Sequence, residues 1–168
     1  MKFKFNLENY VSLQDLMRDF SYLFEVGFVI TSYPDKNYNC IAWAADITDK
    51  WFDSSKEGKW PNDFKGPEFT DLIDAYEDLG FKKCNDGSYV EGLQKIAIYA
   101  KQGLNTFGFK TVFWTHAAKQ LDADTWSSKI GKSFDIQHKT AHDLEVGKGN
   151  NSDVYGKVYV FMSRELKN

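Results

Sequence analysis

The sequence is poor in the residues that build disulfide frameworks and metal centres. Its 168 residues include two cysteines, Cys40 and Cys84, and three histidines. Two cysteines do not make a disulfide scaffold, and no cysteine or histidine spacing matches a zinc site. Dinucleotide-binding, phosphate-binding and calcium-binding loop motifs are also missing. We therefore expect two free thiols, no metal and no cofactor.

Long apolar runs are missing as well. No segment approaches membrane-spanning length, and the stretch from Met1 to Asn6 lacks the apolar core of a signal peptide. The net charge of −3 gives no general attraction to nucleic acid. These absences predict a cytoplasmic protein, unless another route delivers it, with neither a nucleic-acid nor a membrane partner.

What is present fits one domain of the α+β class spanning residues 1–168. Hydrophobic residues make up 42% of the chain and charged residues 27%, which is ordinary for a globular protein, but the aromatic share of 17% is high. Helical spacing dominates the first half and strand alternation the second. The expected helices cover residues 12–24, 40–52 and 67–79. The expected strands cover residues 93–100, 110–121, 125–131 and 157–162, with a hairpin at 122–124 and a polar loop at 147–153.

Cys40 and His116 are the strongest candidates for chemistry. Cys40 follows a polar loop and begins the apolar segment Ile41-Ala42-Trp43, so it is expected at a helix N-terminus. His116 lies within the predicted strand 110–121. A helix N-terminus and a nearby imidazole both favour the thiolate, which is the reactive form. We therefore expect Cys40 as nucleophile, His116 as general base, and a Cys40 thiol that titrates below about 8.5. The competing interpretation is that Cys40 is a packing residue of the core.

A third polar group usually orients the imidazole of such a pair. His138 and Asp135 are the first candidates, and Gln120 and Ser128 are alternatives. Asn37 or Asn39 would cap the Cys40 helix and help to bind an oxyanion beside the Cys40 amide. Trp43 is expected to line the substrate site.

Three other residues receive structural interpretations. Lys129 is expected to face solvent from its strand, although a cation near the site is the alternative. His142 is placed in a short helix capped by Thr140, and Cys84 in a half-buried strand or loop.

Four sequence blocks resemble a family of largely uncharacterised bacterial and fungal domains. They are Asn39-Cys40-Ile41-Ala42-Trp43-Ala44, residues 95–99, residues 115–121, and residues 126–131 followed by Asp135-Ile136-Gln137-His138. More loosely, the order of Cys40, His116 and the Ser128-Lys129 block is similar to that of NlpC-type and CHAP-type cell-wall hydrolases. That resemblance implies a papain-like core, with N-terminal helices packed on an antiparallel sheet, and amide-bond chemistry.

These observations lead to two hypotheses about function. The first is a cysteine hydrolase or acyltransferase that acts on a peptide or another amide through a Cys–His dyad or triad. The second is a non-catalytic binding module on the same scaffold, in which an aromatic cleft near Trp43, Trp51, Trp60 and Trp114 holds a protein partner.

Overall fold

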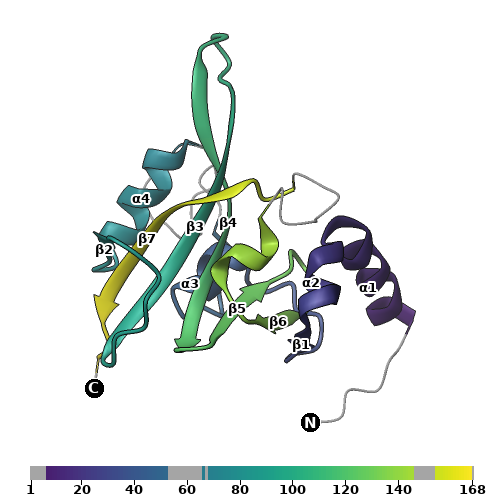
Figure 1. The fold of residues 1–168 in the computed structure, drawn as a ribbon. Helices are drawn as coiled ribbons and strands as arrows, with labels where there is room; N and C mark the ends of the chain where they lie inside the picture. Colours follow the sequence, from purple (N-terminus) through teal and green to yellow (C-terminus); the bar gives the residue numbers. More distant parts are fainter. Residues whose placement is uncertain (1–6, 53–65, 67, 146–153, 168) are drawn as a thin grey trace.

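The computed structural model describes residues 7–52, 66, 68–145 and 154–167, and side chains from residue 13 onward. It forms a single α+β domain in which helices pack on a seven-stranded antiparallel sheet of order β1-β6-β5-β4-β3-β7-β2 (Figure 1). The strands are β1 (Phe28–Ile30), β2 (Lys82–Cys84), β3 (Leu93–Leu104), β4 (Lys110–Asp122), β5 (Thr125–Lys129), β6 (Asp135–His138) and β7 (Lys157–Glu165). The helices are α1 (Leu7–Asp19), α2 (Ser21–Val26), α3 (Cys40–Ala44), α4 (Phe69–Glu77) and the 3-10 helix η1 (Ala141–Leu144).

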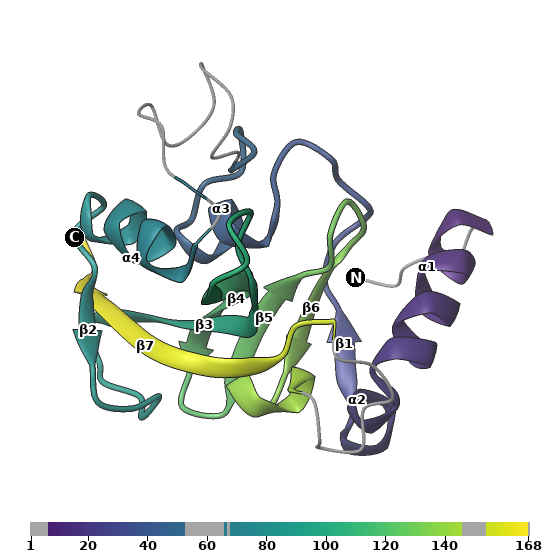
Figure 2. The same ribbon diagram turned by 90° about the horizontal axis from the view of Figure 1, so that it is seen from above.

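Both faces of the sheet are covered. Figure 2 shows α3 and α4 on one side and α2 with η1 on the other. Two separate apolar clusters result, because successive strand residues point to opposite faces. Ile98 and Ala117 belong to the cluster under α3 and α4, which we call the α3 face. Tyr99 and Ala118 belong to the cluster under α2 and η1, which we call the η1 face.

The predicted N-terminal helix is two helices. Phe20 leaves helical geometry, with φ −129° and ψ 57°, and separates α1 from α2. This break lets Leu16, Phe20 and Leu23 all enter the η1-face core. Ser12, expected as the N-cap, lies inside α1. Gly27 ends α2 as expected, at φ 89°.

The helix that begins at Cys40 is much shorter than predicted. It ends at Ala44 because Asp46 adopts φ 62°, and the amides of Asp46 and Ile47 return to the carbonyls of Trp43 and Ala42. This is a Schellman-type helix end. The carboxylate of Asp46 is held there by Lys119 at 2.6 Å and by Gln94 at 2.7 Å.

Arg164 connects the ends of both helices on the α3 face to the sheet. Its guanidinium donates to the Ala45 carbonyl after α3 at 3.0 Å and to the Leu79 carbonyl after α4 at 3.1 Å. It also donates to the side chain of Gln94 at 2.8 Å. These bonds satisfy carbonyls that a helix leaves without partners at its C-terminus.

Strand prediction was right for four of the seven strands. β3, β4, β5 and β7 fall where alternation indicated, and the β4–β5 hairpin forms with Asp122 opposite Thr125. β1, β2 and β6 were not predicted, because each has only three or four residues. The loop expected at 147–153 lies outside the described residues.

Candidate active site

Cys40 is the first residue of α3, as predicted. Asn39 caps the helix through its Oδ1, which accepts the Ala42 N–H at 3.1 Å. The cysteine is half-buried and packs against the apolar cluster of the α3 face. A thiol is therefore placed at a short, well-anchored helix start.

Burial dominates the electrostatics of the Cys40 thiol. It raises the pKa to about 11, against smaller lowering effects from the backbone amides of Ala117, Ile41 and Cys40 and from the charge of Lys129. This direction is opposite to the one expected for a thiol that titrates below about 8.5. Desolvation outweighs the local donors, because a thiolate loses more hydration on burial than these donors return.

His116 lies on β4, as predicted, and is fully buried. Its ring stacks on Tyr155 with centroids 4.0 Å apart and planes 7° apart, and it meets the edge of Tyr99 at 5.1 Å. Burial lowers the pKa of His116 well below its usual value, and the charge of His138 adds to the effect. His116 is therefore neutral at neutral pH.

Three side chains form a hydrogen-bonded row across the η1 face, and we call it the relay. His116 Nε2 lies 3.0 Å from Ser128 Oγ, and Ser128 Oγ lies 2.8 Å from His138 Nε2. His138 Nδ1 lies 2.8 Å from the Thr140 carbonyl. The row crosses β4, β5 and β6, so each member sits on a different strand.

The direction of every hydrogen bond in the relay follows from its last member. The Thr140 carbonyl can only accept, so His138 Nδ1 carries a proton. Burial lowers the pKa of His138, so the ring is neutral and its Nε2 must accept from the Ser128 hydroxyl. Ser128 then has no further proton to give and accepts from His116 Nε2. The remaining nitrogen, His116 Nδ1, is left as a bare base.

His116 Nδ1 is buried and has no hydrogen-bond partner among the described residues. Among the described residues, no hydrogen bond joins His116 Nδ1 to Cys40 Sγ. The two residues approach the same point of β4 from different sides, since Cys40 packs on the α3 face while the His116 ring lies among Tyr99 and Tyr155 on the η1 face. The amide of Ala117, the residue after His116, reaches the Cys40 sulfur.

Asp135 belongs to a different group from His116. Its Oδ2 accepts the hydroxyl of Tyr38 at 2.8 Å, and its Oδ1 is buried without a hydrogen-bond partner in the described part of the chain. Its backbone amide donates to Ser32 Oγ at 2.8 Å. Asp135 therefore fastens the loop that leads into Cys40, and its side chain is not hydrogen-bonded to the His116 ring.

Lys129 is buried, which corrects the expectation of a solvent-facing strand residue. Its ammonium donates to the carbonyls of Asp35, at 2.6 Å, and Ser133, and lies 5.0 Å from the centre of the Tyr38 ring. Alternation alone could not show this, because both faces of β5 are covered. The buried cation and Asp135 hold the loop before Cys40 from two sides.

The other predicted residues around Cys40 are also positioned by the fold. Asn39 Nδ2 donates one hydrogen bond, to the Phe52 carbonyl at 2.9 Å, while its Oδ1 accepts the Ala42 and Phe52 amides. Asn37 is exposed, and its backbone amide donates to Asp35 Oδ1 at 2.8 Å. Trp43 donates to Ser127 Oγ at 3.0 Å and stacks under Lys119 Nζ at 3.5 Å.

Comparison with known proteins places this arrangement in a family. A family model described as a domain of unknown function, DUF7689, matches residues 29–163. The chain belongs to the DUF7689 family. The match includes all four sequence blocks on which the first resemblance rests. No curated protein and no solved structure matches the chain.

Other residues of the DUF7689 domain lie apart from the relay. Gln120 donates to the Gly87 carbonyl at 2.9 Å, and Cys84 bonds the Asp86 carbonyl. His142 sits in η1 after the cap Thr140, as predicted, and pairs with Glu145 at 3.1 Å. Trp60 lies outside the described residues. Within the described chain, no group of three or more acidic, histidine or cysteine residues could hold a metal, and no helix is long and apolar enough to cross a membrane.

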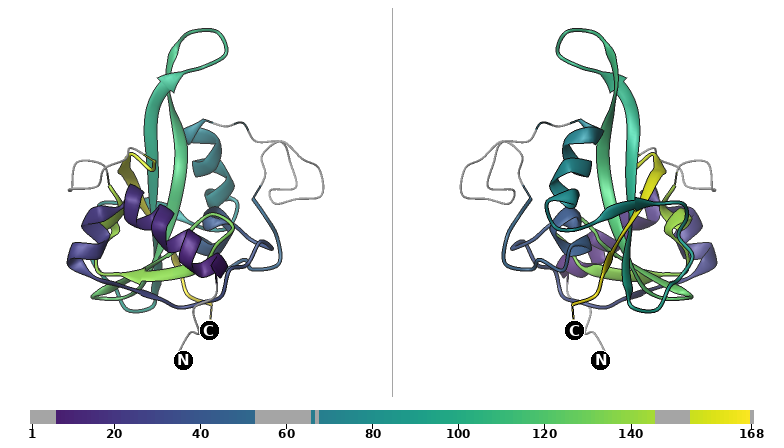
Figure 3. Two further views of the ribbon diagram at one scale, coloured as in Figure 1. Left: turned by 90° about the vertical axis from the view of Figure 1, so that its right-hand side faces the viewer. Right: turned by 90° about the vertical axis from the view of Figure 1, so that its left-hand side faces the viewer.

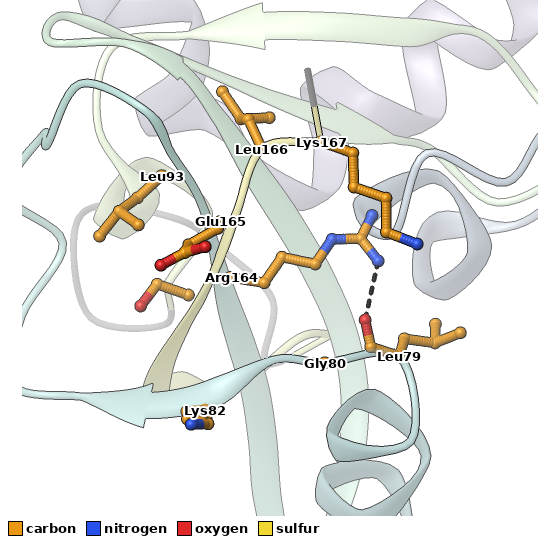
Figure 4. A pocket seen from close by; sticks show the side chains of 9 residues that line it. Leu79, Gly80, Lys82, Leu93, Arg164, Glu165, Leu166 and Lys167 are labelled. Atoms are coloured by element: carbon orange, nitrogen blue, oxygen red, sulfur yellow. Dashed lines mark hydrogen bonds between the residues drawn. The ribbon is translucent and has the colours of Figure 1, made fainter.

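A cleft of about 570 Å³ lies between the chain that follows α4 and the C-terminal part of β7 in the DUF7689 domain, and it contains none of the predicted site residues. Figure 4 shows Lys82, Arg164 and Lys167 around it, with Glu165 nearby. Three of the five N–H groups of the Arg164 guanidinium are bound to the Leu79 and Ala45 carbonyls and to the Gln94 side chain.

The sequence did not predict that Ser128 lies at the centre of the relay. It also did not predict that Tyr155 stacks on His116 or that the Thr140 carbonyl accepts from His138. Ser128 was only one of four alternatives, because a serine in a strand carries no sign of which face it occupies. Tyr155 follows a polar loop in the sequence, and no hydrophobic pattern around it predicted a buried position beside His116. Thr140 was predicted as a helix cap. Its backbone carbonyl also sets the direction of the hydrogen bonds in the relay, and residue types alone do not reveal a backbone acceptor.

Proposed function

We propose that this DUF7689 domain is a cysteine-dependent hydrolase or acyltransferase with a papain-like core, in which Cys40 attacks an amide or related acyl carbon. The observation that carries the proposal is the relay, which holds His116 in the tautomer whose Nδ1 is basic and unpartnered. An unpartnered buried nitrogen costs about 1–3 kcal/mol of stability, so such a group calls for a functional explanation.

The pKa directions fit general-base catalysis better than a preformed thiolate–imidazolium pair. Burial raises the pKa of Cys40 and lowers that of His116, so thiol and imidazole are both neutral before substrate binds. The proposal requires the Cys40 proton to pass to His116 Nδ1 as the C–S bond forms, although in the described structure the two groups lie on different faces of β4 and share no hydrogen bond. His116 would then return it to the leaving amine, and water or another nucleophile would release the acyl group from sulfur.

In this proposal Ser128 and His138 are positioning residues. They fix the ring and tautomer of His116 without touching substrate, as the third member of a Ser–His–Asp triad does. Backbone amides at the start of α3 would stabilise the oxyanion.

The non-catalytic binding module remains the second candidate because of one observation: both Cys40 and His116 are neutral and His116 is fully buried. If Cys40 and His116 only pack in the core, these two properties are all that their role requires. The two candidates differ in whether sulfur ever carries an acyl group.

Hydrolysis of p-nitrophenyl acetate separates the candidates. We expect a burst of one p-nitrophenolate per chain and an acetyl group on the Cys40 peptide by mass spectrometry. Cys84→Ser, the matched control, should keep the burst, whereas Cys40→Ser should abolish it. His116→Gln should slow acylation by about 10²–10⁴-fold. A folded wild-type protein without acylation at Cys40 would support the binding module instead.

A further inference from the structure

The β3–β4 hairpin extends beyond the rest of the sheet. The pairing of β3 with β7 ends at Ala100 opposite Lys157, and the pairing of β4 with β5 begins only at Ala118. Between these limits the two strands continue to pair with each other as far as Leu104 and Lys110. Figures 1 and 3 show the resulting two-stranded arm, which we define as residues 101–113, projecting from the body of the domain.

The tip of the arm is apolar and exposed. Phe107 is 82% exposed, Phe109 69% and Leu104 65%. Lys110 lies opposite Leu104 beside the tip, Lys101 lies opposite Phe113 at the base of the arm, and residues 101–110 include no acidic side chain. The tip is therefore locally cationic although the whole chain carries a net charge of −3.

Asn105 gives the tip a fixed shape. Its Oδ1 accepts the amides of Phe107 and Phe109, each at 3.0 Å. Its backbone amide donates to the Phe109 carbonyl at 2.9 Å, and its carbonyl accepts the Gly108 amide at 2.9 Å. A preordered turn loses less conformational entropy when its side chains are buried by a partner.

The area of the tip limits what can cover it. Fully burying an aromatic side chain removes about 150–250 Å² from water, so the three exposed side chains together offer roughly 400 Å². A stable protein interface needs about 800 Å² on each partner. The tip is also convex, so a protein partner would have to supply a socket. Insertion into the headgroup region of a membrane requires neither a large area nor a socket, and lysines on the arm complement anionic lipids.

We propose that the arm tip, formed by Leu104, Phe107 and Phe109 with Lys110 beside it and Lys101 at the base of the arm, inserts into the surface of a membrane that contains anionic lipids. This departs from the expectation that no membrane is involved. That expectation rests on the lack of a spanning run, which a peripheral tip does not need. The inference is independent of the proposed chemistry at Cys40.

Co-sedimentation of the full chain with vesicles tests the proposal. We expect binding to vesicles of equal parts phosphatidylglycerol and phosphatidylcholine, and at least tenfold weaker binding to pure phosphatidylcholine. Phe107→Ser with Phe109→Ser should lower the bound fraction at least fivefold, and Lys101→Gln with Lys110→Gln should remove most of the preference for anionic lipid. Val29→Ser, at a residue that is 59% exposed on β1, is the matched control and should bind as the wild type does.

Three outcomes would overturn the proposal. They are failure of the wild type to sediment with either vesicle, unchanged binding by the folded Phe107/Phe109 variant, and equal loss in the Val29 variant. Sedimentation velocity supplies a further check. A wild-type dimer that the phenylalanine substitutions dissociate would assign the tip to a second copy of the chain and overturn the lipid assignment.

Discussion

The two faces of the sheet bury polar groups in opposite ways. On the α3 face, near Cys40, Lys129 and Asp135 are buried and bonded to backbone carbonyls and to the Tyr38 hydroxyl. On the η1 face, His116, Ser128 and His138 are buried as neutral groups that bond one another. The first arrangement holds the loop before Cys40 in place. The second sets which ring nitrogen of His116 carries the proton. The polar groups of the α3 face therefore bond mainly to the loop before Cys40, whereas those of the η1 face bond to one another.

Lys129→Met is the strongest way to break the α3-face arrangement. The substitution removes the Lys129 donor from the Asp35 and Ser133 carbonyls, of which Ser133 keeps the Asp35 amide, and it takes the nearby cation from Asp135. We therefore expect a loss of about 3 kcal/mol in the free energy of unfolding. Urea denaturation measures it, with Lys132→Met at an exposed neighbour as control. A loss below about 1 kcal/mol would show that the buried cation does not hold the loop.

Adjacent serines on β5 give a direct comparison of the two faces. Ser128→Ala leaves two buried imidazole nitrogens without a partner, and we expect a loss of about 2 kcal/mol. Ser127→Ala removes one acceptor from the partly buried Trp43 indole and should cost less than about 1 kcal/mol. Equal losses in urea denaturation would contradict the relay as a satisfied hydrogen-bond network.

The two faces should also affect the pH dependence of stability differently: Cys40 on the α3 face acts at alkaline pH, and His138 on the η1 face acts at acid pH. Burial raises the folded pKa of Cys40 to about 11, so its stability contribution is present below the unfolded thiol pKa and is lost as the pH rises toward 11. We expect the wild type to lose about 1–2 kcal/mol more than Cys40→Ser between about pH 8.5 and 10. Buried tyrosines with raised pKa act in the same direction, so only the difference between the two proteins measures Cys40.

His138 tests the other face in acid. Its folded pKa lies below the unfolded value of 6.5, so its contribution is present above that value and is lost as the pH falls below it. His138→Asn should reduce the acid slope of stability by at most about 1.4 kcal/mol per pH unit. Asp135 acts in the opposite sense, because burial raises its pKa, and its effect cancels in the comparison of variant and wild type. An unchanged slope would mean that His138 is not buried neutral.

The sequence was most informative where a pattern was long or a residue type was special. β4, with thirteen residues, and the Asn39 cap of Cys40 were both predictable. The length of α3 was not, because it ends through the φ of a single aspartate, Asp46, which Lys119 and Gln94 hold from distant strands. Predicting the buried state of Lys129 needed knowledge of which helix covers β5.

The candidate site also has one part that the sequence predicts and one part that it does not. His116 and Cys40 were found from their chemistry and their predicted elements. The connection from His116 through Ser128 to His138 depends on the register that sets Ala118 opposite Ser128 and Trp126 opposite His138. A shift of one residue would turn these side chains to the other face, and residue types alone do not fix that register.

Arg164 has a consequence for how the protein forms during synthesis. It follows Ala45, whose carbonyl it binds, by 119 residues. At a translation rate of about 5–20 residues per second, α3 would wait roughly 6 to 24 seconds for the guanidinium that closes its end. A five-residue helix does not persist alone in water over that time. The nascent chain therefore carries Cys40 before the Arg164 guanidinium that binds the end of α3 has been made.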